Sequence, residues 1–114
     1  MDMGVPCRVT LTNMRVKIAR VYFSDISKTL EPKMRVVLTI RHVSGASVKT
    51  IGVVERVIKK QHRYDFSYVA VRIPWDVAMM LAKISGEAVE ERKKVELHGF
   101  GVDISKVVNP PPLH

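Results

Sequence analysis

Cysteine is nearly absent from the chain, because Cys7 is the only one among 114 residues. A lone thiol cannot close an intramolecular disulfide, so the bridge-stabilised folds of small secreted domains are excluded. No apolar run approaches the roughly 18 to 20 residues that span a bilayer, and the N-terminal residues lack the basic and then apolar layout of a signal peptide. We therefore expect a cytoplasmic protein with no membrane partner.

Clusters of metal-ligating or catalytic residues are also missing. The histidines have no cysteine or second histidine at the short spacings of zinc sites; they are His42, His62, His98 and His114. The glycine turns "SGAS" and "HGFG" do not extend into a phosphate loop, and no nucleophile, base and oxyanion donor can be named together. The sequence predicts no cofactor and no enzymatic activity. A pocket joining His62 or His98 to carboxylates would instead favour a small enzyme.

The composition is that of a folded domain, with 46% hydrophobic and 26% charged residues. Carboxamides are scarce, since Gln61 is the only glutamine and Asn13 and Asn109 are the only asparagines. Few amides and many charges are typical of thermophile proteins. We expect one compact domain over residues 1–106 and a flexible proline-rich tail, "VVNPPPLH", over residues 107–114.

Positive charge is the strongest compositional feature. The formal net charge is +8 and the calculated pI is about 9.9. Residues 1–73 hold 14 Lys or Arg against 5 acids, a net charge of +9, whereas residues 74–114 hold 5 against 6, a net charge of −1. Such uneven positive charge indicates a polyanion-binding protein.

The apolar pattern predicts mostly strands. Residues 33–42, "KMRVVLTIRH", place Met34, Val36, Leu38 and Ile40 on one face, and their β-branched content favours a strand over a helix. Less regular strands are expected in residues 7–12, 14–23, 48–60, 66–73 and 93–104. We expect Met14, Val16 and Ile18 to share a face, residues 24–32 to form a loop, and a bulge at Gly52.

One helix is predicted, over residues 75–84. Pro74 precedes it, Gly86 follows it as a C-terminal cap, and the apolar stripe consists of Val77, Met80, Leu81 and Ile84. Residues 87–94 are expected to be a polar, partly helical connection. The predicted fold class is α+β, a mainly antiparallel sheet or small open barrel of about five to six strands with this helix before the last strand.

A cationic segment spans the end of the strand expected in residues 48–60 and the turn that follows it. It contains Arg56, Lys59, Lys60 and Arg63 close together, with a hairpin turn expected in residues 60–65. Phosphates attract such a cluster by counterion release, independently of base sequence. We interpret it as a nucleic-acid-binding arm, the alternative being a solvated hairpin tip.

Aromatic residues follow directly. Tyr64, Phe66 and Tyr68 alternate on one face of the expected strand, and Arg72 extends the same row. Bases can stack on such rings while neighbouring cations hold the phosphates. The alternative is that the rings are covered by a loop, a helix or a partner subunit.

Two local family resemblances accompany this pattern. "DFSYVAV" resembles the central strand of an RNA-recognition motif and "RVYFSDI" is similar to its first strand, which implies single-stranded RNA binding with Tyr22, Phe66 and Tyr68 as base-stacking residues. That resemblance requires residues 33–41 to form the family's first helix. "RIPWDVAMMLAKISGE" is similar to the strand-proline-helix element of swapped-hairpin DNA-binding regulators. Each covers only part of the chain, so neither assigns a family.

The function expected from the sequence is therefore binding of nucleic acid, DNA or RNA, through a cationic sheet surface and hairpin with added base stacking. The alternative is an oligomeric structural or adaptor protein, such as a homodimer. In that case Phe66, Tyr68, Trp75 and exposed strand edges would form the protein interface.

Overall fold

The computed structural model describes residues 3–27, 29–59 and 67–108. Within these ranges the chain forms six strands and one helix, in the order β1 Val5–Asn13, β2 Lys17–Asp25, β3 Arg35–His42, β4 Ser47–Lys59, β5 Ser67–Ile73, α1 Trp75–Ser85 and β6 Lys94–Val108. The expected α+β class, the strand number and the helix before the last strand are confirmed.

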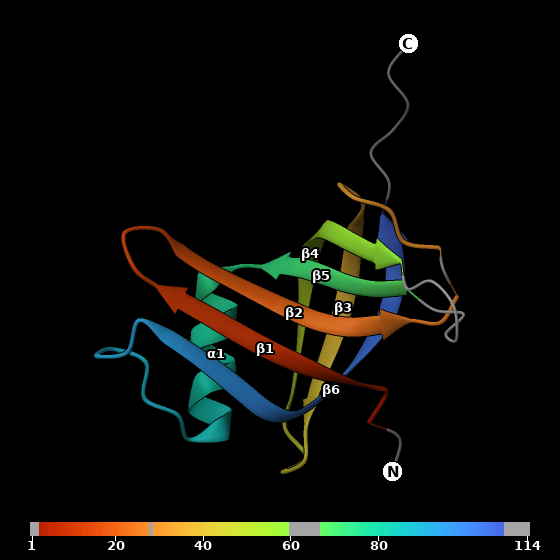
Figure 1. Ribbon diagram of the computed structural model, residues 1–114. Helices are drawn as coiled ribbons and strands as arrows, with labels where there is room; N and C mark the ends of the chain where they lie inside the picture. Colours follow the sequence, from red (N-terminus) through yellow and green to blue (C-terminus); the bar gives the residue numbers. More distant parts are fainter. Residues whose placement is uncertain (1–2, 28, 60–66, 109–114) are drawn as a thin grey trace.

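The six strands form a closed antiparallel barrel in the order β1-β2-β5-β4-β3-β6 (Figure 1). Closure depends on the two longest strands. Strand β6 pairs with β1 along residues 94–102 and with β3 along residues 100–108, while β4 pairs with β3 along residues 47–53 and with β5 along residues 53–59. The barrel is therefore closed and not open, and strand edges are not presented as they would be at the ends of an open sheet.

Alternating apolar side chains fill the barrel. Val36, Leu38 and Ile40 of β3 are fully buried, as their spacing predicts, and Val69 and Val71 of β5 are fully buried as well. Burial of β-branched side chains on a pleated strand is favourable because their stiff χ1 costs little there. The core consequently lies inside the barrel, and the alternate residues of each strand are left for the outer surface.

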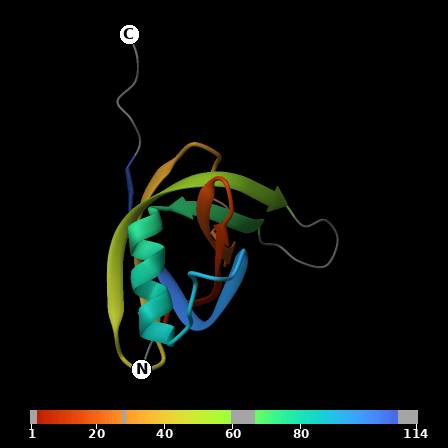
Figure 2. The same ribbon diagram turned by 90° about the vertical axis from the view of Figure 1, so that its left-hand side faces the viewer.

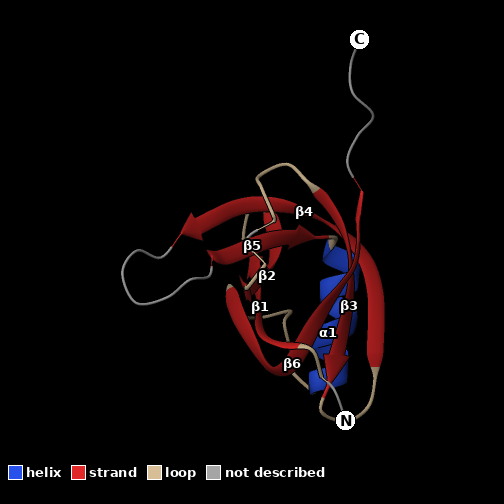
Figure 3. Ribbon diagram, turned by 90° about the vertical axis from the view of Figure 1, so that its right-hand side faces the viewer, coloured by secondary structure: helices blue, strands red, loops and turns tan. Residues whose placement is uncertain are grey.

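Helix α1 lies across one end of the barrel. It contacts β2, β4 and β6, which are alternate strands around the ring. Figure 2 shows the helix in front of the strands, and Figure 3, from the opposite side, shows it behind them. The helix ends at Gly86, whose φ of 80° is the left-handed conformation that glycine adopts without strain.

The buried face of α1 differs from the predicted stripe. Ala78, Leu81 and Ala82 are buried, whereas Met80 is 49% exposed. The small alanines let the helix approach the barrel end closely, so the contact centre moves away from Met80. The connection after the helix contains turns but no further helical residues, and Val89 is its buried anchor.

The first hairpin also corrects an expectation. Met14 and Val16 are exposed in the bend between β1 and β2 and do not continue a strand face with Ile18. The inward positions of β2 are instead Ala19, Val21 and Phe23. A bend resets the alternation, so residues on its two sides need not share a face.

The loop after β2 is held by a buried carboxylate. Asp25 accepts hydrogen bonds from the Leu30 backbone N–H at 3.0 Å and from the Ser27 hydroxyl at 2.6 Å. These bonds satisfy the carboxylate and place Leu30 in the core, where it is 4% exposed. The expected loop is confirmed, except that Ser24 and Asp25 belong to β2.

The RNA-recognition resemblance does not extend to the fold. Arg35–His42 forms strand β3, so the helix that the resemblance placed in residues 33–41 is replaced by a strand, as the alternation predicts. The described chain has one helix, of 11 residues, and no described helix has the length and apolar character needed to cross a membrane.

The bulge of β4 lies three residues beyond the predicted position. The β4–β5 register shifts between Val54 and Arg56, whereas Gly52 pairs regularly with Val36. A Cβ added at Gly52 would lie 2.5 Å from Val71 Cγ1 and 3.0 Å from the Arg72 carbonyl oxygen. Gly52 therefore serves close approach of β5 at the barrel corner.

Gly52→Ala should lower the free energy of unfolding by about 1–3 kcal/mol, because the new methyl group overpacks a buried contact. Urea unfolding followed by fluorescence of Trp75 measures the loss. Lys49→Ala, on the exposed side of the same strand, is the control and should change stability by less than about 0.5 kcal/mol. Equal stabilities of the two variants would contradict the steric role.

Candidate nucleic-acid interface

The outer side of four adjacent strands carries a surface that we name the arginine–tyrosine face. The strand register brings its members into three adjacent rows across β1, β2, β5 and β4. Its residues are Arg8, Arg20, Tyr22, Glu55, Arg56, Tyr68 and Arg72. They come from segments far apart in the sequence, and only the barrel register makes them neighbours.

Two tyrosines form the aromatic part of this face. Tyr22 of β2 and Tyr68 of β5 have ring centroids 6.2 Å apart and planes inclined by 23°. Ser24 is the register partner of Tyr68, so the two tyrosines are diagonal neighbours, within reach of aromatic side chains. The Arg8 guanidinium carbon lies 5.2 Å from the Tyr22 centroid, in cation–π range. Both rings are half-buried and keep outer surface.

Three arginines surround one carboxylate beside the tyrosines. Arg20 donates from Nε at 3.0 Å and approaches through Nη2 at 2.9 Å, both to Glu55 Oε1. The hydrogen bond with Arg20 lowers the pKa of the Glu55 carboxyl, assisted by the charges of Arg20, Arg72 and Arg56. The same bond raises the pKa of Arg20. The three arginines and the one carboxylate together carry a net local charge of +2.

Two backbone features allow this cluster. The bulge between Val54 and Arg56 makes the consecutive residues Glu55 and Arg56 both exposed. Strand β5 lies between Arg20 and Glu55, and its outward residues there are Arg72, the register partner of Arg20, and the small Ala70, only 3% exposed. The small Ala70 side chain leaves room beside Arg72 for the long side chains of neighbouring strands to meet.

The arginines differ in how far they are already neutralised. Arg20 has Glu55, and Arg8 has Glu96 of β6 at 3.6 Å. Within the described ranges, Arg56 and Arg72 make no salt bridge, and both are exposed. The Arg56 and Arg72 guanidiniums can therefore bind an external anion without first breaking a salt bridge to a described residue.

The predicted site residues are only partly brought together. Arg56, Tyr68 and Arg72 lie on the arginine–tyrosine face, while Lys59 is exposed at the end of β4 opposite Ser67. Lys60, Arg63, Tyr64 and Phe66 lie outside the described residues. Prediction from the residue pattern missed Arg8, Arg20 and Glu55, and Tyr22 was named only through the family resemblance.

Other reactive groups do not form a second centre in the described chain. No group of three His, Cys, Asp or Glu side chains there could hold a metal ion. Burial raises the pKa of the Cys7 thiol to about 12, so the thiolate is scarce at neutral pH. His98 Nε2 lies 3.5 Å from Glu96 on the exposed side of β6, and His62 is outside the described residues.

Comparison with known proteins adds no relative: no protein-family model, no curated protein and no solved structure matches the chain.

Glu55→Gln should destabilise the protein at pH 7 by no more than about 1 kcal/mol, because the Arg20 pair is only partly buried. The carboxyl pKa is lowered by folding, so this stabilisation is complete above the unfolded pKa of about 4.3 and disappears as the pH falls through the folded value. Urea unfolding of wild type and variant at pH 7 and near pH 3 measures both differences.

The matched control is Glu91→Gln, in the exposed connection before β6. It should change stability little at either pH. A Glu55→Gln effect of equal size at both pH values would refute the ion-pair explanation.

Proposed function

We propose that this protein binds single-stranded nucleic acid on the arginine–tyrosine face. The observation that carries the proposal is the position of Arg56 and Arg72, which make no salt bridge with any described residue, next to the stacked rings of Tyr22 and Tyr68. Guanidiniums supply planar donors for phosphate oxygens, and tyrosine rings supply surfaces for bases. A cytoplasmic location belongs to the same proposal.

The preference for a single strand follows from the shape of the surface. The face is the outside of the barrel, and helix α1 packs at one end of the barrel. Bases paired inside a duplex cannot place their flat faces on Tyr22 or Tyr68, whereas unpaired bases can. Duplex nucleic acid would therefore contact only the arginines of this face.

The alternative, an oligomeric adaptor protein, receives less support. Barrel closure removes the open sheet ends on which strand-edge pairing would depend. Trp75 lies at the start of α1, half-buried, with the Lys17 ammonium 5.9 Å from its ring centroid. Tyr68 is engaged with Tyr22. Light scattering at several concentrations tests this alternative directly.

The combined change Arg56→Gln and Arg72→Gln should weaken binding of an oligonucleotide and flatten its salt dependence. For a single strand, each lost phosphate contact lowers the slope of log K against log salt by about 0.7, so the double variant should lose about 1.4. Fluorescence anisotropy with labelled single-stranded and duplex DNA and RNA at several salt concentrations measures the slope.

A control with the same charge change is Lys83→Gln with Arg92→Gln, at α1 and the following connection. It should leave the slope nearly unchanged. If both double variants lose affinity equally, net charge and not this face accounts for binding. If wild type binds none of these probes at low salt, the proposed function is wrong.

Tyr68→Ala should weaken single-strand binding by about 1–3 kcal/mol, the range for stacking one base, and leave duplex binding close to wild type. Tyr68→Phe keeps the ring and should retain most of the affinity. Anisotropy titrations measure the affinity of both variants for single-stranded and duplex ligands. An equal loss for both kinds of ligand would indicate a structural role for Tyr68.

A further inference from the structure

An apolar groove adjoins the arginine–tyrosine face. Ile51, Val53, Ile73 and Pro74 form its apolar lining, and the groove encloses about 490 Å³. Ile51 and Val53 are 57% and 41% exposed on the outward side of β4. The volume lies in the range of sites for small organic groups, about 300–1,000 Å³.

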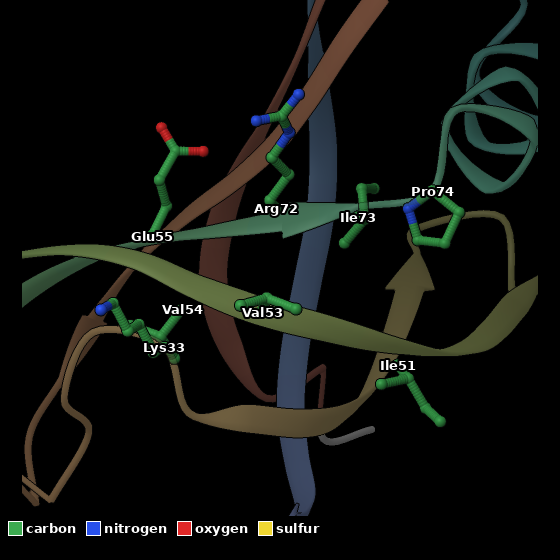
Figure 4. Close-up of a pocket in the computed structure, with 8 residues that line it drawn as sticks. All are labelled: Lys33, Ile51, Val53, Val54, Glu55, Arg72, Ile73 and Pro74. Carbon is green, nitrogen blue, oxygen red and sulfur yellow. The ribbon is translucent and has the colours of Figure 1, made fainter.

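The groove and the arginine cluster are continuous. Arg72 and Glu55 belong to both, and Val53 is the register partner of Arg72. Figure 4 shows Arg72 and Glu55 extending to the same side of the strands, with Ile73 and Pro74 following Arg72 toward α1. A ligand that places an anionic group on Arg72 therefore has apolar surface within reach.

Charge complementarity selects the occupant. The cations bordering the groove are Lys33 and Arg72, and its one acidic residue, Glu55, is already hydrogen-bonded to Arg20. An apolar floor with cationic borders suits an aromatic ring carried on a phosphate backbone.

We propose that the groove holds a second base of the single strand whose phosphates lie on Arg56 and Arg72. This inference rests on the proposed function and extends it. Tyr68 precedes Arg72 by four residues on the same face of β5, a distance of about 14 Å. The arginine cluster thus lies between two base-holding surfaces, the tyrosine pair and the groove. Very short oligonucleotides bind at the tyrosine pair, and longer ones fill both surfaces.

The experiment uses one double variant, Ile51→Ser combined with Val53→Ser. It compares the affinity of this variant and of wild type for thymidine oligonucleotides from two to about ten nucleotides long. The variant should bind the dinucleotide like wild type and lose about 5- to 150-fold in affinity for the long oligonucleotide, the range expected for one base contact. Met14→Ser with Val43→Ser removes two exposed apolar side chains from turns and should lose nothing at any length.

Each outcome bears on the proposal. Wild type that binds no oligonucleotide overturns both the proposed function and this inference. Wild type that binds, with a variant that binds every length equally well, overturns the groove site alone, and so does a loss that is independent of length. A wild-type dimer that the serine variant abolishes would assign the groove to a second copy of the chain. Should the double variant fold poorly, Val53→Thr, which keeps the side-chain shape, gives the same comparison.

Discussion

Closure of the six-stranded barrel is the constraint on which the other features depend. A closed ring allows each strand only one inward set of side chains, so Val36, Leu38, Ile40, Val69 and Val71 fill the interior and their neighbours must face outward. The staggered pairing of β4 and β6 makes the ring close with only six strands. Because helix α1 covers a barrel end and not a sheet face, the outer sides of β1, β2, β5 and β4 are left for solvent and ligands.

The composition of that outer surface follows from a local departure from regular pairing. Without the bulge after Val54, Glu55 and Arg56 would point to opposite sides of β4, and one of them would enter the core. With it, both side chains face outward, and Glu55 reaches Arg20 across strand β5. The ion pair holds Arg20 in place at little energetic gain, since it remains partly exposed. Its larger consequence is to orient the Arg20 guanidinium on the outer surface.

Local signals in the sequence predicted the elements well and their assembly less well. The alternation of residues 33–42 and the Pro74-to-Gly86 frame depend on neighbouring residues, so both were predictable. Barrel closure depends on pairing between strands such as β1 and β6, which local periodicity does not encode. The contact between Tyr22 and Tyr68 is of the same kind: the alternation placed Tyr68 on an aromatic strand face and the family resemblance named Tyr22, but only the β2–β5 register joins them. The helix stripe was misjudged because alanine, a weak hydrophobic signal, makes the closest packing contact.

Total charge alone would not have located the candidate site. The excess of basic residues in residues 1–73 is spread around the barrel: Arg41 pairs with Asp103, Lys17 lies over Trp75, Lys49 projects from β4 opposite Thr39, and Arg35 of β3 is the register partner of Val53 in the groove. Such a field can steer a polyanion toward the protein without fixing where it binds. What distinguishes the arginine–tyrosine face is that exposed guanidiniums without a described salt bridge adjoin both stacked rings and an apolar groove. On the proposed function, a phosphate backbone attracted by the whole molecule is retained at this face because its bases also contact the rings and the groove.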